Sequence, residues 1–203
     1  MPDDLALIQI VDAALAEAAR KSDAWLACRP GCAECCMGPF AITAPDAARL
    51  RRGLADLESL DPARAARVRA RAAEAVQHLE RDYPGDTVAR VLAEDGAAED
   101  DPCPALDPGT KTCDLYAARP ITCRTFGPAV SFGGEALVVC DLCYQGATEA
   151  QIAACQVELD PGLLQESDTG DTIVAFALTA SKCAAVCFAT ELRPPATLPA
   201  GRV

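Results

Sequence analysis

The sequence predicts a mainly α protein, in which a single domain of packed helices surrounds an irregular, cysteine-rich metal-binding core. Three observations carry this prediction. Apolar residues recur at helical spacing in several segments, helix-capping signals stand before those segments, and most cysteines lie in two regions dense in Pro and Gly. A chain of 203 residues suits one domain. We expect this domain to cover residues 1–192, followed by an extended or disordered tail over residues 193–203.

The helices follow from spacing and caps. The first is expected over residues 3–21, because Leu5, Ile8 and Val11 fall on one apolar stripe. Thr43, followed by Pro45, marks the start of the second. This second helix is expected to end at about residue 57. The same kinds of signal predict further helices over residues 62–82, 87–93, 148–157 and 171–191. At most one small β-hairpin is expected, across Gly133-Gly134.

Charge and hydropathy limit the kinds of partner that the protein can be expected to bind. The net charge of −12 argues against nucleic acid and against anionic membrane surfaces, because phosphate contacts need clustered Lys and Arg. The arginines Arg64, Arg67 and Arg71 are expected on the solvated side of their helix. The longest apolar run, residues 173–190, is interrupted by Ser181-Lys182, so no membrane span is expected. An acidic start without a signal-peptide pattern favours the cytoplasm.

Twelve cysteines are well above ordinary usage. Nine of them form the two regions: Cys28, Cys32, Cys35 and Cys36 first, then Cys103, Cys113, Cys123, Cys140 and Cys143. In a reducing compartment, clustered thiols indicate metal or redox chemistry more often than a disulfide framework. Adjacent cysteines such as Cys35 and Cys36 do not easily bond to each other, since the ring they would close is strained. The two regions are therefore expected to meet around one or two metal centres.

The type of metal follows from the ligands. Thiolate selects zinc, copper(I) or iron–sulfur centres. His78, the single histidine, lies in an arginine-rich helix and is not expected to be a ligand. A site built from sulfur alone indicates structural zinc or an iron–sulfur cluster. The spacings Cys32-x₂-Cys35 and Cys140-x₂-Cys143 are each typical of a turn that presents two thiolates to one ion, with backbone N–H groups aimed at the sulfurs.

Residues beside the cysteines are candidates to support a metal. Arg119 and Arg124 bracket Cys123 and either hydrogen-bond the sulfurs, offsetting the negative charge of a thiolate site, or form ordinary salt bridges. Tyr116 is expected to pack on the same loop or to donate its hydroxyl to a ligand. The cysteines outside the two regions are expected to be buried structural residues: Cys155, Cys183 and Cys187.

An ordered series of motifs resembles a known family. The motifs are Cys32-x₂-Cys35-Cys36, Cys103-Pro-Ala-Leu-Asp, Cys113-Asp-Leu-Tyr116 and Arg119-Pro-x₂-Cys123-Arg124-x-Phe126-Gly127. Together, over about residues 28–145, they resemble the CxxCxxCC (YkgJ-like) cysteine-cluster family, which implies a zinc- or iron-chelating domain. The first gap, Cys28-x₃-Cys32, is one residue longer than the family name describes, which makes Cys28 the less secure ligand.

The function predicted is metal binding by cysteine thiolates, with zinc or an iron–sulfur cluster that is at least partly structural. The ligands expected first are Cys32, Cys35, Cys36, Cys103, Cys113 and Cys123, followed by Cys28, Cys140 and Cys143. Two alternatives stay open: an iron–sulfur enzyme of protein modification, since flagellin lysine N-methylases resemble this family in their cysteine cluster, or a thiol redox or metal-delivery protein. The sequence identifies no catalytic residue, no methyl-donor site and no particular protein partner.

Overall fold

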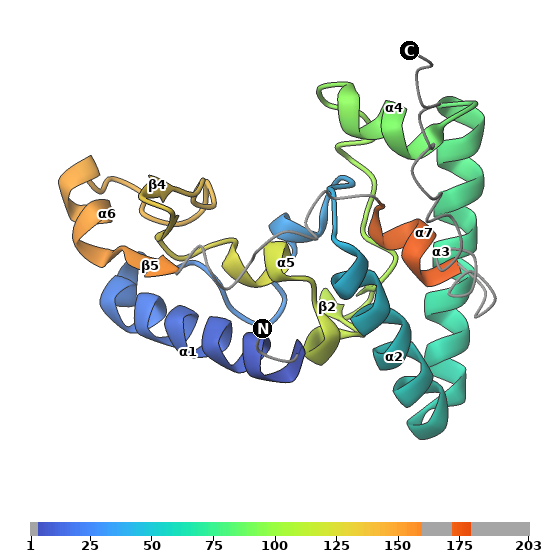
Figure 1. The fold of residues 1–203 in the computed structure, drawn as a ribbon, viewed down its shortest axis with the longest axis horizontal. Coiled ribbons are helices and arrows are strands. Elements are labelled where there is room, and N and C mark those ends of the chain that lie inside the picture. The colour runs from blue at the N-terminus through green and yellow to red at the C-terminus, as the bar shows by residue number, and fades with distance from the viewer. Residues whose placement is uncertain (1–3, 160–171, 180–203) are drawn as a thin grey trace, which may run out of the picture.

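The structure is a computed structural model that describes residues 4–159 and 172–179 (Figure 1). It is mainly α, as predicted. The α-helices are α1 (Asp4–Ser22), α2 (Ala44–Leu60), α3 (Pro62–Asp82), α4 (Thr87–Ala93), α5 (Ile121–Thr125), α6 (Glu149–Cys155) and α7 (Val174–Thr179). Three short 3₁₀ turns add η1 (Asp23–Trp25), η2 (Glu34–Cys36) and η3 (Tyr116–Ala118). None of the described helices is long and apolar enough to span a membrane.

The predicted caps are present. The Thr43 hydroxyl accepts the amide of Asp46 at 3.2 Å, and Asp61 accepts the amide of Arg64 at 2.9 Å. Thr148 forms a capping box at the start of α6. Of the helix predicted over 171–191, only α7 falls within the described residues, and the tail lies outside them.

The structure contains more strands than the single hairpin predicted. The expected hairpin exists as β3 (Val130–Phe132) and β4 (Glu135–Ala136), but the single-hairpin expectation needs correction in two places. β5 (Val157–Leu159) pairs in parallel with β3, which gives the sheet order β4-β3-β5. A second hairpin joins β1 (Leu106–Asp107) to β2 (Thr112–Cys113). Two-residue strands leave no alternation in a sequence, and a parallel pairing depends on contacts distant along the chain.

The helices form two packing groups, which Figure 1 shows on opposite sides of α5. In the first, α2, α3 and α7 pack on one another and fully bury Leu50, Leu54 and Val68. In the second, α1 packs on α5, α6 and β5, where Ala18, Val130 and Leu159 are buried. The cysteine loops run between the groups.

Two of the three arginines predicted to face solvent are engaged elsewhere. Arg64 and Arg71 both form ion pairs with Asp114, whose side chain is fully buried directly after Cys113. Arg71 also donates to the Pro104 carbonyl at 2.9 Å. The arginine side of α3 therefore holds the second cysteine region against the helix, a role that the helix sequence gave no means to distinguish from solvation.

Candidate metal centre

Five thiols from four separate segments form the first site, named here the five-thiol group: Cys35 and Cys36 from η2, Cys103 from the loop before β1, Cys113 from β2 and Cys123 from α5. The strongest electrostatic neighbours of Cys36 include Cys35, Cys103 and Cys113. Those of Cys123 are Cys103, Cys113 and Cys35. The structure thus brings together parts of both cysteine regions.

Backbone hydrogen bonds align the two regions. The Cys103 amide donates to the Cys36 carbonyl at 2.7 Å, and the Gly38 amide donates to the Asp101 carbonyl at 2.8 Å. Met37 and Pro102 form a β-bridge between these bonds. These contacts fix the η2 turn against the Cys103 loop.

The β1–β2 hairpin sets the spacing of Cys103 and Cys113. Leu106 pairs with Cys113 in the hairpin register, and the Leu106 amide donates to the Cys103 carbonyl at 2.9 Å. Asp107 holds the turn by accepting the amide of Thr110 at 2.8 Å. Two residues in each strand suffice here because the turn, rather than strand length, determines the geometry.

Backbone amides point at the sulfurs of Cys103 and Cys113. The amides of Ala105 and Leu106 are directed at the Cys103 sulfur, and the amide of Leu115 is directed at that of Cys113. Hydrogen bonds of this kind favour the thiolate. Burial acts in the opposite direction and is the larger effect: it raises the pKa of Cys103 to about 12 and raises the pKa of Cys113. A metal ion would have to displace these protons on binding.

The adjacent pair Cys35-Cys36 behaves differently. The Cys36 thiol donates to the Cys35 sulfur and lowers the pKa of Cys35 to about 6, and the positive charge of Arg119 acts in the same direction. The same hydrogen bond, followed by burial, raises the pKa of Cys36. All ten cysteines among the described residues are free thiols, and the adjacent pair is not bonded.

Arg119 is the positive charge of the five-thiol group. It interacts electrostatically with Cys35, Cys113 and Cys123. Its guanidinium carbon lies 3.7 Å from the ring centroid of Tyr116, so the exposed tyrosine holds the arginine by a cation–π contact. The Arg119 Nε is buried and has no hydrogen-bond partner, which sets it apart from the other buried polar side-chain atoms of residues 4–159 and 172–179. Such a donor beside thiols fits a centre with negative charge.

Arg124, the other candidate beside Cys123, forms an ordinary ion pair. Its Nη1 donates to the Asp12 carboxylate of α1 at 2.6 Å, its Nη2 to the Ala117 carbonyl at 2.6 Å and its Nε to the Arg119 carbonyl at 3.1 Å. These bonds direct its donors to oxygen rather than sulfur. Arg124 therefore joins α1 to the η3–α5 loop.

His78 is held between carboxylates. Its Nδ1 lies 3.0 Å from Asp101 and its Nε2 lies 3.0 Å from Asp82. Both ring nitrogens are thus engaged by carboxylates.

The remaining four clustered cysteines form a second set, named here the four-thiol group: Cys28, Cys32, Cys140 and Cys143. The sulfurs of Cys28 and Cys143 lie 4.0 Å apart. Although the residue as a whole is exposed, desolvation of its sulfur raises the pKa of Cys28 to about 12, and Cys143, Cys32 and Cys140 act in the same direction. Cys140 and Cys143 are buried, whereas Cys28 is exposed. Cys32 enters this group as an electrostatic neighbour of Cys28.

The four-thiol group is fixed by its own turns. The Cys32 amide donates to the Arg29 carbonyl at 2.9 Å, and the Cys143 amide donates to the Cys140 carbonyl at 2.8 Å. Tyr144 joins the two turns, because its amide donates to the Trp25 carbonyl at 2.8 Å. Its buried hydroxyl contacts Ser22 at 2.6 Å and accepts the Ala129 amide at 2.7 Å.

The donor chemistry of both groups fits a thiophilic metal. A tetrahedral zinc site with Zn–S bonds near 2.3 Å has sulfurs about 3.8 Å apart, close to the separation between Cys28 and Cys143. Over residues 4–159 and 172–179, no three Cys, His, Asp or Glu side chains converge tightly enough to surround one ion. Closing either group around a metal therefore requires its side chains to move closer together.

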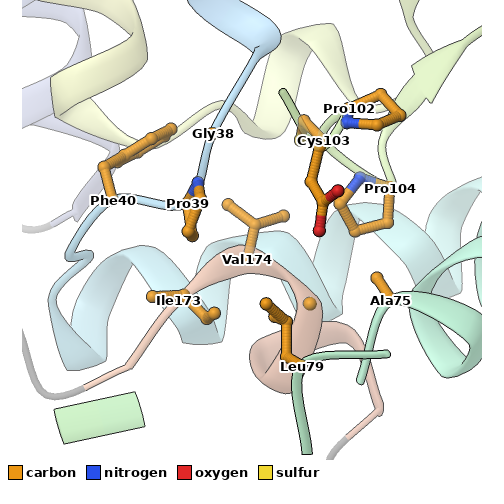
Figure 2. A pocket seen from close by; sticks show the side chains of 12 residues that line it. Gly38, Pro39, Phe40, Ala75, Leu79, Pro102, Cys103, Pro104, Ile173 and Val174 are labelled. Atoms are coloured by element: carbon orange, nitrogen blue, oxygen red, sulfur yellow. The ribbon is translucent and has the colours of Figure 1, made fainter. Parts of the chain in front are cut away.

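Two hollows border the five-thiol group. The first is a cavity of about 30 Å³ where the Cys103 loop meets α3 and α7 (Figure 2). It has room for a water molecule or two, but not for an organic ligand. The second is an open cleft of about 250 Å³ lined by Cys35 and Cys123, with Met37, Phe40 and Phe126 among its apolar walls. The five-thiol group is thus reachable from solvent.

A family model described as "CxxCxxCC: Putative zinc- or iron-chelating domain" matches residues 27–143, more than half of the chain. The chain belongs to the CxxCxxCC family. The match begins one residue before Cys28 and ends at Cys143, so it spans both thiol groups. Comparisons of this CxxCxxCC protein with curated proteins and with solved structures gave no match.

Proposed function

We propose that this CxxCxxCC protein binds a thiophilic metal, as zinc or as an iron–sulfur cluster, through the five-thiol group in the cytoplasm, and that the metal is at least partly structural. The observation that carries the proposal is that five free thiols from four segments are electrostatic neighbours of one another beside the unpartnered Nε of Arg119. The proposed ligands come from Cys35, Cys36, Cys103, Cys113 and Cys123. When bound, the metal would replace the thiol protons and join η2, the β1–β2 hairpin and α5.

The charge arrangement supports this proposal. Four thiolates around a divalent ion leave a net charge near −2. Arg119 would offset part of that charge and donate its free N–H to a sulfur, which is the usual task of outer residues in thiolate sites. Tyr116 would act by holding the guanidinium from its exposed side. A fifth thiol exceeds the need of a four-ligand site, so one member would remain an unligated neighbour.

The test is metal content after anaerobic purification. We expect zinc, or iron with acid-labile sulfide, in the unaltered protein, and a large loss of that metal in Cys36→Ser and Cys113→Ser. Cys155→Ser is the matched control, because Cys155 is buried, belongs to neither group and directs its thiol to the Lys21 carbonyl. Equal metal content in all four proteins would contradict the proposal.

The open cleft favours a second candidate, in which the centre also reacts. An iron–sulfur enzyme of protein modification, or a thiol redox or metal-delivery protein, needs access to its centre, and the cleft provides it at Cys35 and Cys123. Alkylation of the metal-loaded protein distinguishes this candidate. Rapid labelling at Cys35 favours it, whereas labelling only after chelation favours a structural metal.

A further inference from the structure

We infer that Cys28, Cys32, Cys140 and Cys143 form a second metal centre, a four-thiolate site for a single zinc ion, separate from the five-thiol group. This inference rests on the proposed function, because it takes thiolate metal binding as given. It adds the number of centres, the ligands of each and the class of the second one.

The first argument is how the thiols pair. The two nearest sulfurs of this group, those of Cys28 and Cys143, are separated by 115 residues in sequence and by 4.0 Å in space. The strongest thiol neighbours of Cys28 are Cys143, Cys32 and Cys140, while those of Cys36 and Cys123 lie in the five-thiol group. Nine thiols thus divide into a set of four and a set of five, rather than gathering at one point.

The second argument is the class of ligand. Two thiolates on one tetrahedral zinc ion lie about 3.8 Å apart. Thiolates of a cubane iron–sulfur cluster each bind a different iron, so their sulfurs lie further apart. The Cys28–Cys143 separation therefore favours a single ion. Four cysteines complete a closed tetrahedral site, as structural zinc requires.

The third argument is that members of the two thiol groups pack against different apolar clusters. Cys140 and Cys143 are buried in an apolar cluster with Tyr144 and Cys155, against which Trp25 packs. Cys103 and Cys113 instead pack against the α2–α3–α7 cluster. A metal at the four-thiol group would join the loop after α1 to the loop before α6, which are held together at present by the Tyr144 amide and hydroxyl.

The turns of the second site have the form that metal-binding turns take. The amides of Leu142 and Cys143 are directed at the Cys140 sulfur. In the other turn, Gly31 has a φ of +91°, which lets the chain reverse between Cys28 and Cys32. Two such turns facing each other are the usual construction of a four-cysteine zinc site.

Trp25 makes the inference testable, because it is the single tryptophan of the chain and lies against the four-thiol group. The experiment compares the unaltered protein with Cys143→Ser and Cys113→Ser, each purified anaerobically and analysed for zinc and iron. Trp25 emission is then followed while a chelator removes metal and while ZnCl₂ is added back.

We expect Cys143→Ser to lose one zinc equivalent and its Trp25 response, and to keep the metal of the five-thiol group. Cys113→Ser should lose metal from the five-thiol group and keep both the zinc and the Trp25 response. Because Cys143 is buried, its replacement can unfold the chain, so Cys28→Ser, at an exposed position, is made in parallel and judged by the same criteria.

Three results would overturn the inference. Loss of all metal in either variant would indicate a single shared centre. An unaltered Trp25 response in both Cys143→Ser and Cys28→Ser would place the metal elsewhere. A Cys28–Cys143 disulfide in a chain that holds metal only at the five-thiol group would assign these thiols to redox chemistry. Absence of any metal from the unaltered protein would instead overturn the proposed function itself.

Discussion

At the scale of the residue, Arg119 connects the protein to its proposed metal. It approaches three thiols, rests on Tyr116 and keeps one buried N–H without a partner. Arg124, five positions on, resembles it in sequence context but satisfies oxygen acceptors from α1 and η3. The sequence identified both arginines as candidates to support a metal. It could not choose between them, because the choice depends on Asp12, which is 112 residues away along the chain.

The first prediction follows from this difference. Replacing Arg119 by Gln should weaken metal binding by about 10- to 100-fold, the usual effect of losing a residue that supports a metal ligand. Competition against a chelator of known affinity measures the change. Arg69→Gln is the control, since Arg69 forms an exposed ion pair with Glu58. Equal affinity for the two variants would remove Arg119 from the site.

Gly127 gives a second prediction at this scale. Its φ is +120°, and a Cβ there would lie 2.9 Å from the Cys28 sulfur. Gly127→Ala should therefore displace Cys28 and lower zinc affinity at the four-thiol group by about tenfold or more, the size of effect seen when the surroundings of a ligand are disturbed. Trp25 emission during zinc titration reports the change.

Gly85→Ala is the control that separates backbone strain at positive φ from contact of the added Cβ with the Cys28 sulfur. Gly85 also has a positive φ, +98°, but an added Cβ there meets nothing within 4 Å. This control carries the backbone strain of a side chain at positive φ, about 1–2 kcal/mol, without contact to a thiol. If both variants bind zinc alike, the contact between Gly127 and Cys28 is irrelevant to metal binding.

At the scale of the element, local signals predicted what local interactions determine. α1, α2, α3 and α4 each lie within a few residues of the predicted bounds, because their caps and apolar stripes are contained in the segments themselves. β5 was missed, since its pairing with β3 is parallel and depends on a distant segment. The sequence left the number of centres open for the same reason, because spacing within a turn does not reveal which other turn it faces.

Gly53 provides a prediction about packing between elements. It lies in α2, where alanine would raise helix propensity by about 1 kcal/mol. A Cβ at this position would overlap the Cβ of Ala118 in η3. We expect Gly53→Ala to destabilise the protein by about 1–3 kcal/mol, as overpacking does, so the sign is opposite to that of propensity. Denaturant unfolding of the metal-loaded protein measures it.

A second substitution checks the cause. Ala118→Gly removes the opposing methyl group, so the double variant should recover most of the stability lost in Gly53→Ala. Without recovery in the double variant, the loss does not arise at the α2–η3 contact.

At the scale of the whole molecule, the two packing groups meet through loops that contain little regular structure. The α2–α3–α7 group has an apolar core of its own, whereas the loops that carry the thiols depend on turns, ion pairs and the proposed metals. We expect chelation to lower the melting temperature by about 10 °C or more, because each kcal/mol lost lowers it by about 2–4 °C in a domain of this size.

Circular dichroism distinguishes loss of the helices from loss of the packing around the thiol loops when metal is removed. The far-ultraviolet signal of the helices should largely remain after chelation, while the near-ultraviolet signal of Trp25 and Tyr144 should decrease. Adding metal back should restore both stability and signal. A melting curve that does not change on chelation would mean that the metals contribute nothing to the fold.

The contact between Cys28 and Cys143 also sets an order of events during synthesis. The 115 residues between them take a ribosome roughly 6 to 23 seconds to make. For that time the thiols of the first region are present without the partners they have in the finished protein. If the proposed sites are correct, metal can complete them only after the second region has emerged, so we expect the nascent chain to need reducing conditions to keep its early cysteines unpaired.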